Sequence, residues 1–191
     1  MESFSLYEHC VMLPYDNKIK ENSLPFSCGN YDLDDFFQNE SELYEKELLG
    51  KTYCWITESR PHRIVALFTL ANDSIKTINL DKSTRNRFNR NINNSKRGRS
   101  YPAALIGRIG VNKGLQGFNI GSQLIDFIKK WFRHEDNKTG CRFLVVDAYN
   151  NPRTLKFYEN NNFKYLYRTE EEEELYFKTT MTRMMYFDLK K

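Results

Sequence analysis

The sequence has few of the features that mark secreted, metal-binding or membrane-spanning proteins. Its four cysteines, Cys10, Cys28, Cys54 and Cys141, stand without CxxC spacing, which predicts neither a zinc site nor a disulfide framework. No apolar run approaches the length of about 18 residues that crosses a bilayer, and the N-terminus lacks the basic and apolar regions of a signal peptide. We therefore expect a cytoplasmic protein with reduced thiols, no membrane contact and no metal.

The common nucleotide-binding signatures are also missing. A Walker loop needs a GKS or GKT tripeptide, and the dinucleotide fold needs GxGxxG, and the chain contains neither. Both classes of nucleotide-binding protein are thereby disfavoured.

What is present is an ordinary globular composition of 191 residues, with 40% hydrophobic and 28% charged residues, which favours one domain over residues 1–191. The net charge of +4 is too small to imply nucleic-acid binding by itself. The charges are segregated, however. The segment Lys82–Arg99 is basic and has no acidic residue, whereas Glu170–Glu174 is an unbroken acidic run.

Hydrophobic periodicity predicts a mixed α/β sheet with helices packed on it. One helix is expected at Asp32–Leu49, with Gly50 placed to end it. A second helix should follow the turn Asn112–Gly121, and a third should cover Pro152–Asn160. The basic segment is predicted as a loop or a polar-faced helix. The expected strands are Phe4–Met12, Tyr53–Thr57, Arg63–Leu70, Ala103–Val111, Phe143–Val146, Phe163–Arg168 and Arg183–Leu189.

The stretch Arg108–Phe132 joins a strand to a helix through a glycine-containing turn, GLQGFNIG. The first turn of a helix leaves backbone N–H groups unpaired, and its dipole favours anions, so such junctions often hold phosphates. By itself the turn is a moderate signal, and a turn with convenient glycines is the alternative interpretation.

Two motifs in order resemble those of the GNAT superfamily of acyl-CoA-dependent N-acyltransferases. Gln116, Asn119 and Gly121 fall on its QxxGxG frame. A strand and about thirty residues later, the segment NNPRTLKFYENNNF is similar to the second motif, NxxAxxFYxxxGF. The resemblance covers Ala103 to Leu189 and implies the GNAT fold, a central mixed β-sheet flanked by helices.

The resemblance also implies acetyl-CoA as co-substrate, with no metal. Main-chain amides of the turn would hold its pyrophosphate, and the strand before the turn would hydrogen-bond its pantetheine arm. Tyr158 matches the family's general acid, which protonates the departing thiolate. The cofactor-binding residues so implied are Ile109, Gly110, Val111, Gln116, Gly117, Phe118, Asn119, Ile120, Gly121, Ser122 and Asn151.

Some residues have a second interpretation or depart from the motifs. A tyrosine at the position of Tyr158, after Phe157 on an amphipathic helix, is in most proteins a core or half-buried residue and not a catalyst. Asn151 can be explained as a helix cap alone. Asn119 and Asn162 replace motif glycines, and asparagine is the residue that best tolerates left-handed backbone angles in place of glycine. No histidine has catalytic spacing, so the general base is unassigned.

The segment PFSCGNYDLDDFF, together with YPAALIGRIGV and TRMMYFDL, extends the resemblance over nearly the whole chain, to GNAT toxins of toxin–antitoxin pairs. Toxins of this subgroup acetylate aminoacyl-tRNA and are silenced by a small DNA-binding antitoxin. The resemblance implies these two partners here, and a homodimer is possible. The basic segment is the candidate tRNA contact. Its candidate substrate-binding residues are Arg85, Arg87, Arg90, Lys96, Arg97 and Arg99.

Two other functions stay open at this point. One is a GNAT enzyme that acetylates a small amine or a protein amine, with the basic segment irrelevant to the choice of substrate. The other is a non-catalytic RNA-binding or partner-binding protein of the same fold.

Overall fold

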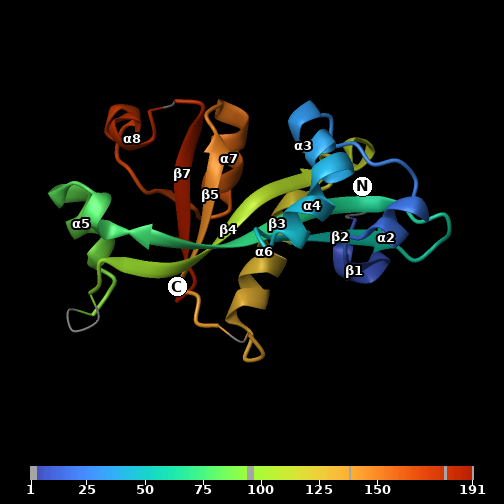
Figure 1. Cartoon of the computed structure of the whole chain (residues 1–191), viewed down its shortest axis with the longest axis horizontal. Coiled ribbons are helices and arrows are strands. Elements are labelled where there is room, and N and C mark those ends of the chain that lie inside the picture. Colours follow the sequence, from blue (N-terminus) through green and yellow to red (C-terminus); the bar gives the residue numbers. More distant parts are fainter. Residues whose placement is uncertain (1–3, 94–96, 138, 179, 191) are drawn as a thin grey trace. The chain divides into compact units, whose positions relative to one another are not determined.

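The computed structural model describes residues 4–93, 97–137, 139–178 and 180–190. Its strands are β1 Cys10–Pro14, β2 Lys51–Thr57, β3 Ile64–Lys76, β4 Ser100–Val111, β5 Phe143–Tyr149, β6 Lys164–Tyr165 and β7 Thr182–Asp188. They form one seven-stranded sheet in the order β1-β2-β3-β4-β5-β7-β6 (Figure 1). The β4–β5 pair is parallel, whereas β1–β2, β2–β3, β5–β7 and β6–β7 are antiparallel. The predicted mixed α/β sheet with flanking helices is confirmed.

The chain divides into two compact units, residues 1–71 with 106–131, and residues 72–105 with 132–191. The first unit contains β1, β2 and the first part of β3. Its buried cluster is built from Tyr15, Phe36, Phe37, Cys54, Ile56, Ile64 and Leu67. Its helical elements are α1 Leu6–His9, α2 Asn17–Glu21, α3 Tyr31–Asp35, the π-helix η1 Phe36–Glu40, α4 Ser41–Lys46, the 3₁₀ turn η4 Lys113–Leu115, and α6 Ile120–Arg133, whose last two residues belong to the second unit.

The second unit contains the end of β3, the start of β4, and β5, β6 and β7. One face of this sheet is covered by a cluster that includes Ile75, Phe88, Tyr101, Phe143 and Val145. The helical elements of the unit are the 3₁₀ turn η2 Thr77–Asn79, α5 Lys82–Asn89, α7 Pro152–Asn160 and α8 Glu170–Phe177.

Two of the predicted strands are wrong in part. Phe4–Met12 was expected to be extended, but Leu6–His9 is helical and the strand begins at Cys10. The side-chain oxygen of Gln123, on α6, accepts a hydrogen bond from the Leu6 backbone N–H at 2.9 Å, and this distant contact fixes the helical turn. Phe163–Arg168 was also expected to be extended, but its strand is limited to Lys164–Tyr165.

The predicted helix Asp32–Leu49 is present as the continuous run α3, η1 and α4, with a wide π turn in its middle. The basic segment is helical over α5, because the Asp81 carboxylate caps its first turn by accepting from the backbone N–H groups of Ser83 and Thr84. Among the described residues, no helix is both long and apolar enough to cross a membrane.

Candidate functional site

The turn between β4 and α6 is held in place by side chains within the first unit. The Asn112 backbone N–H donates to the Val65 carbonyl at 2.9 Å, and its side-chain amide donates to the Ile64 carbonyl at 3.0 Å. Further along, the Gln116 side-chain amide donates to the carbonyls of Cys28, at 2.8 Å, and Val111, at 3.1 Å. The predicted Gln116 therefore acts through its side chain as a clamp that shapes the turn.

The turn bends because two residues adopt left-handed backbone angles, Gly117 with φ of 93° and Asn119 with φ of 59°. An added Cβ at Gly117 would meet nothing within 4 Å, so the glycine serves the backbone conformation and not a tight packing contact. Asn162, the other replacement of a motif glycine, also has a positive φ, of 63°. Both asparagines thus keep the conformation that glycine supplies in the GNAT motifs.

The turn opens onto the first turn of α6, a helix of 14 residues with no acidic side chain in that first turn. The earliest backbone bond of this helix runs from the Gln123 N–H to the Asn119 carbonyl at 3.2 Å. Helix geometry therefore leaves the Ile120 and Gly121 N–H groups without an intrahelical acceptor. Ile120 is buried, whereas Phe118, in the turn, is 42% exposed. The turn is thus exposed, whereas the helix that follows it is fixed in the core by Ile120. This arrangement is suited to binding an anion.

Two cations that the sequence analysis missed lie at this turn. The Arg63 guanidinium lies against Gly114, with one of its nitrogens 2.8 Å from the position that a Cβ on this glycine would take. The Lys113 side chain lies along Gly29, 3.4 Å from the position of a Cβ on that residue. Arg63 precedes a strand that lies far from the turn in the sequence, and no local pattern marks it as a partner of the turn.

The end of β4 carries the other predicted cofactor residues of this unit. A Cβ on Gly110 would stand 3.2 Å from both the Cys28 side chain and the Phe37 ring, so Gly110 lets β4 approach the helical run closely. Ile109 and Val111 are half-buried. Gly110 is thus explained by packing whether or not a cofactor binds to this strand.

In the second unit, α7 presents Tyr158 and Asn151. Asn151 caps the helix, its side-chain oxygen accepting from the Thr154 N–H at 2.9 Å, which typically stabilises a helix by about 1 kcal/mol. Tyr158 is 5% exposed and its ring contacts those of Phe157 and Phe163. Desolvation, followed by the charge of Asp147, raises the pKa of the Tyr158 phenol well above its usual value. The phenol is therefore protonated at neutral pH, the form that a general acid requires.

The basic segment is only partly available to a ligand. The Arg87 guanidinium donates to the backbone carbonyls of Tyr165 and Leu166 at 3.2 and 2.7 Å, which fixes α5 to the β6 region. Arg97 is exposed, and its Nε donates to the Ile92 carbonyl at 3.3 Å. Arg90 and Arg99 are exposed and Arg85 is half-buried. The predicted contact residue Lys96 lies outside the described residues.

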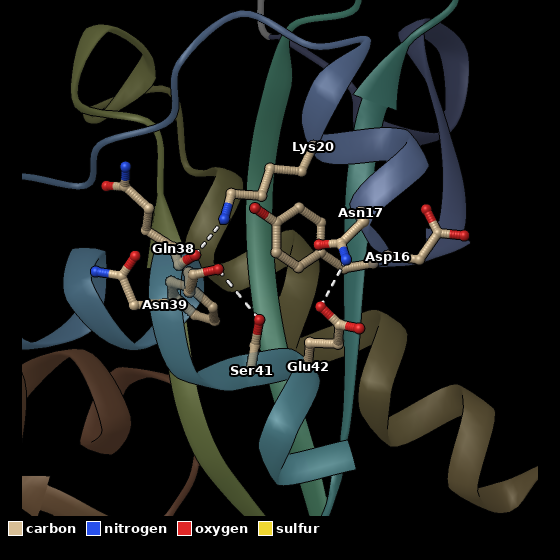
Figure 2. Close-up of a pocket in the computed structure, with 9 residues that line it drawn as sticks. Asp16, Asn17, Lys20, Gln38, Asn39, Ser41 and Glu42 are labelled. Atoms are coloured by element: carbon tan, nitrogen blue, oxygen red, sulfur yellow. Dashed lines mark hydrogen bonds between the residues drawn. The ribbon is translucent and has the colours of Figure 1, made fainter. Parts of the chain in front are cut away.

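A hollow of about 240 Å³ lies elsewhere in the first unit, between α2 and the π turn (Figure 2). Its polar side chains largely satisfy one another. Lys20 donates to the Gln38 carbonyl, and the Asn17 amide donates to the Glu42 carboxylate at 2.6 Å. The hollow contains none of the residues implied by the GNAT motifs.

The sequence matches the model of the acetyltransferase (GNAT) family over residues 31–163. No curated protein sequence matches it. Among solved structures, a tyrosine-to-phenylalanine mutant of KacT is 15% identical, with 96% of each chain covered and a TM-score of 0.72. AtaT in complex with acetyl-methionyl-tRNAfMet is 16% identical, with 95% of each chain covered and a TM-score of 0.69. A mutant AtaT toxin bound to acetyl-CoA and the C-terminus of the antitoxin AtaR is 15% identical, covering 96% of this chain and 95% of that one, with a TM-score of 0.67.

Proposed function

This chain belongs to the GNAT acetyltransferase family and is an N-acetyltransferase, and we propose that it transfers the acetyl group of acetyl-CoA to the amino group of an aminoacyl-tRNA. The observation that carries the coenzyme proposal is the left-handed turn at Gly117 and Asn119, which leads to the Ile120 and Gly121 amides, for which helix geometry provides no intrahelical acceptor. The tRNA assignment is supported by the likeness to AtaT, whose structure contains an acetylated aminoacyl-tRNA.

Acetyl-CoA carries its negative charge on the pyrophosphate and on the phosphate of its ribose. In the proposal, the Ile120 and Gly121 amides hold the pyrophosphate, while Arg63 and Lys113 neutralise phosphate charge beside the turn. The pantetheine arm adds to the backbone of β4 near Ile109, Gly110 and Val111 as an extra strand would.

Tyr158 is the proposed general acid. Attack of an amine on the thioester gives a tetrahedral intermediate, and its collapse expels a thiolate that must be protonated. The buried phenol keeps its proton until that step, because desolvation disfavours the phenolate.

For the tRNA we propose phosphate contacts from Arg85, Arg90, Arg97 and Arg99. Phosphate neutralisation supplies most of the affinity for nucleic acid and positions the substrate without reading its bases. Arg87 is left out of this set, because its guanidinium is occupied by the carbonyls of Tyr165 and Leu166. Two further partners stay predictions, a small DNA-binding antitoxin and a second copy of the chain. The first is supported by the structures of AtaT with the antitoxin AtaR and of KacTA with DNA.

The test is incubation of the protein with labelled acetyl-CoA and a pool of charged tRNA, followed by gentle hydrolysis of the ester that joins amino acid to tRNA. We expect the label in the released amino acid and none in deacylated tRNA. Tyr158→Phe should lower the single-turnover rate by about 100-fold or more while acetyl-CoA still binds. Label that enters only small amines or proteins would refute the tRNA assignment, and full activity of Tyr158→Phe would refute the acid assignment.

A further inference from the structure

Asp147 departs from its neighbours on β5. The residues on either side of it, Val146 and Ala148, are 1% exposed, and the strand begins with a run of buried apolar side chains, yet Asp147 is exposed. Because side chains alternate along a strand, Asp147 lies on the same face as Phe143 and Val145, the face covered by the buried cluster of the second unit. A carboxylate therefore lies at the end of an apolar face.

The position also marks a change in strand pairing. The parallel ladder between β4 and β5 comprises Ala103↔Phe143, Ala104↔Leu144 and Leu105↔Val145, and among the described residues it extends no further. Asp147 comes after the last of these pairs, and its ladder partner is Met184 of β7. Beyond Val145, β5 thus has one edge that pairs with β7 and one edge without a ladder partner among the described residues.

The charges around Asp147 are mostly negative. Asp73, on β3, lies on the same face of the sheet, because it stands two residues before Ile75 of the buried cluster. On α8, Glu173 is neutralised by the Arg183 guanidinium, with 2.6 Å between Oε2 and Nε, and its other oxygen accepts from the Met184 backbone N–H. Arg183 also lies 3.5 Å from Glu170, so this cation already forms ion pairs with two glutamates.

The carboxylate of Asp147 has neither an ion pair nor a hydrogen bond with any described residue. Desolvation, then the charges of Asp73 and Glu173, raise the pKa of its carboxyl, although the residue keeps contact with solvent. Desolvation, and after it the charge of Asp147, raises the pKa of Tyr158 on α7. An unpaired carboxylate with negative neighbours, near a buried phenol, attracts a cation.

We propose that Asp147 binds the ammonium group of the acceptor and takes its proton, with Asp73 as a second negative charge that positions the cation. This inference rests on the proposed function, because it requires an amine acceptor, and it supplies the general base that the sequence motifs leave unassigned. The acceptor class that fits is a primary amine protonated at neutral pH, such as the α-amino group of an aminoacyl ester.

The ammonium passes one proton to the Asp147 carboxylate, which releases it to solvent, and the neutral amine attacks the thioester carbon. As the C–N bond forms and the C–S bond breaks, the thiolate takes the Tyr158 proton. The nitrogen loses its second proton, which restores the phenol through solvent. The products are the amide, the free thiol of the coenzyme and one proton in solution.

The role of Asp147 is tested by measuring single-turnover rates with saturating acetyl-CoA, from pH 6 to pH 9. The proteins compared are wild type, Asp147→Asn and Asp147→Glu. At pH 7 we expect Asp147→Asn to be slower by about 100- to 10,000-fold. Its rate should recover toward that of wild type as pH passes about 8, where α-amino groups lose their proton unaided. Asp147→Glu should keep part of the rate. Glu174→Gln, at an exposed acidic position on α8, is the matched control, and its rate should equal that of wild type.

A purely structural role for Asp147 would give a different pattern. Loss of activity at every pH to the same degree, with weakened acetyl-CoA binding and no rescue by glutamate, would overturn the inference, as would full activity of Asp147→Asn at pH 7. Charged tRNA and a panel of small primary amines serve as acceptors. If wild type acetylates a small amine but not tRNA, the proposed substrate fails while Asp147 is still tested. If wild type acetylates no amine, both ideas fail.

Discussion

The side-chain amide of Gln116 donates a 2.8 Å hydrogen bond to the backbone carbonyl of Cys28, 88 residues earlier in the chain. This bond ties the candidate coenzyme turn to the segment before α3. We predict that Gln116→Ala weakens acetyl-CoA binding by about three- to tenfold, because a hydrogen bond of this kind contributes about 0.5–1.5 kcal/mol to holding the turn in shape. Calorimetric titration measures the change. Gln38→Ala, at an exposed position, is the control and should bind as wild type does.

Position 119 separates backbone conformation from side-chain chemistry. Because Asn119 has φ of 59°, Asn119→Gly should keep both the melting temperature and the affinity for acetyl-CoA. Asn119→Val should cost about 1 kcal/mol, lower the melting temperature by about 2–4 °C and weaken coenzyme binding, because a β-branched residue is strained in this conformation. Weaker binding by the glycine variant would instead assign a direct role to the asparagine side chain.

Arg63 is predicted to contribute charge to coenzyme binding. Arg63→Ala should raise the dissociation constant of acetyl-CoA and make that constant less sensitive to salt, since one phosphate-neutralising cation is removed. Titrations at low and high salt provide the measurement. Lys18→Ala, which removes an exposed cation from α2 in the same unit, should change neither value.

Two arginines of the basic segment should behave differently. Arg87→Ala removes hydrogen bonds to the carbonyls of Tyr165 and Leu166, and we expect a loss of about 1.5 kcal/mol, seen as a melting temperature lower by about 3–6 °C. Arg90→Ala should leave the melting temperature unchanged but reduce by about 1 the slope of log affinity for tRNA against log salt. If Arg90→Ala instead lowered the melting temperature and left the salt dependence of tRNA binding unchanged, the basic segment would not be the tRNA contact.

Buried tyrosines should make the protein sensitive to alkali. The pKa of Tyr158 is raised in the folded chain, and burial raises those of Tyr15 and Tyr167 to about 12. Above about pH 10 the unfolded chain loses phenolic protons that the folded chain still binds, so the free energy of unfolding falls as pH rises. Melting temperatures from pH 8 to pH 11 should drop more steeply for wild type than for Tyr158→Phe. Parallel curves would show that Tyr158 ionises normally.

The parts of the fold that were predictable are those whose signals are local. The apolar run from Phe143 predicted a buried strand, and Asn151 followed by Pro152 predicted where α7 begins. Helix α8 has a local signal too, because Thr169 caps it by accepting from the Glu172 N–H, but its run of carboxylates lacks the apolar periodicity that predicts a helix. Acidic residues in a first helical turn are in fact favoured by the helix dipole.

The parts that were not predictable depend on distant residues. Leu6–His9 is helical where the local pattern indicated a strand, and the contact from Gln123 that holds it comes from α6. Arg63 reaches the turn only after folding brings it to Gly114. Asp147 was overlooked because one carboxylate in an apolar strand has no spacing to detect, and its significance depends on where the β4 ladder ends.

The open surroundings of Gly117 have an evolutionary consequence. If the turn recognises its ligand through main-chain amides, selection at residues 117 and 119 acts on dihedral angle and hardly on side-chain identity. Related chains should then drift freely at the exposed position 118 while alternating only between glycine and asparagine on either side of it. A competitor molecule that binds the same amides would leave the protein few single substitutions by which to escape it.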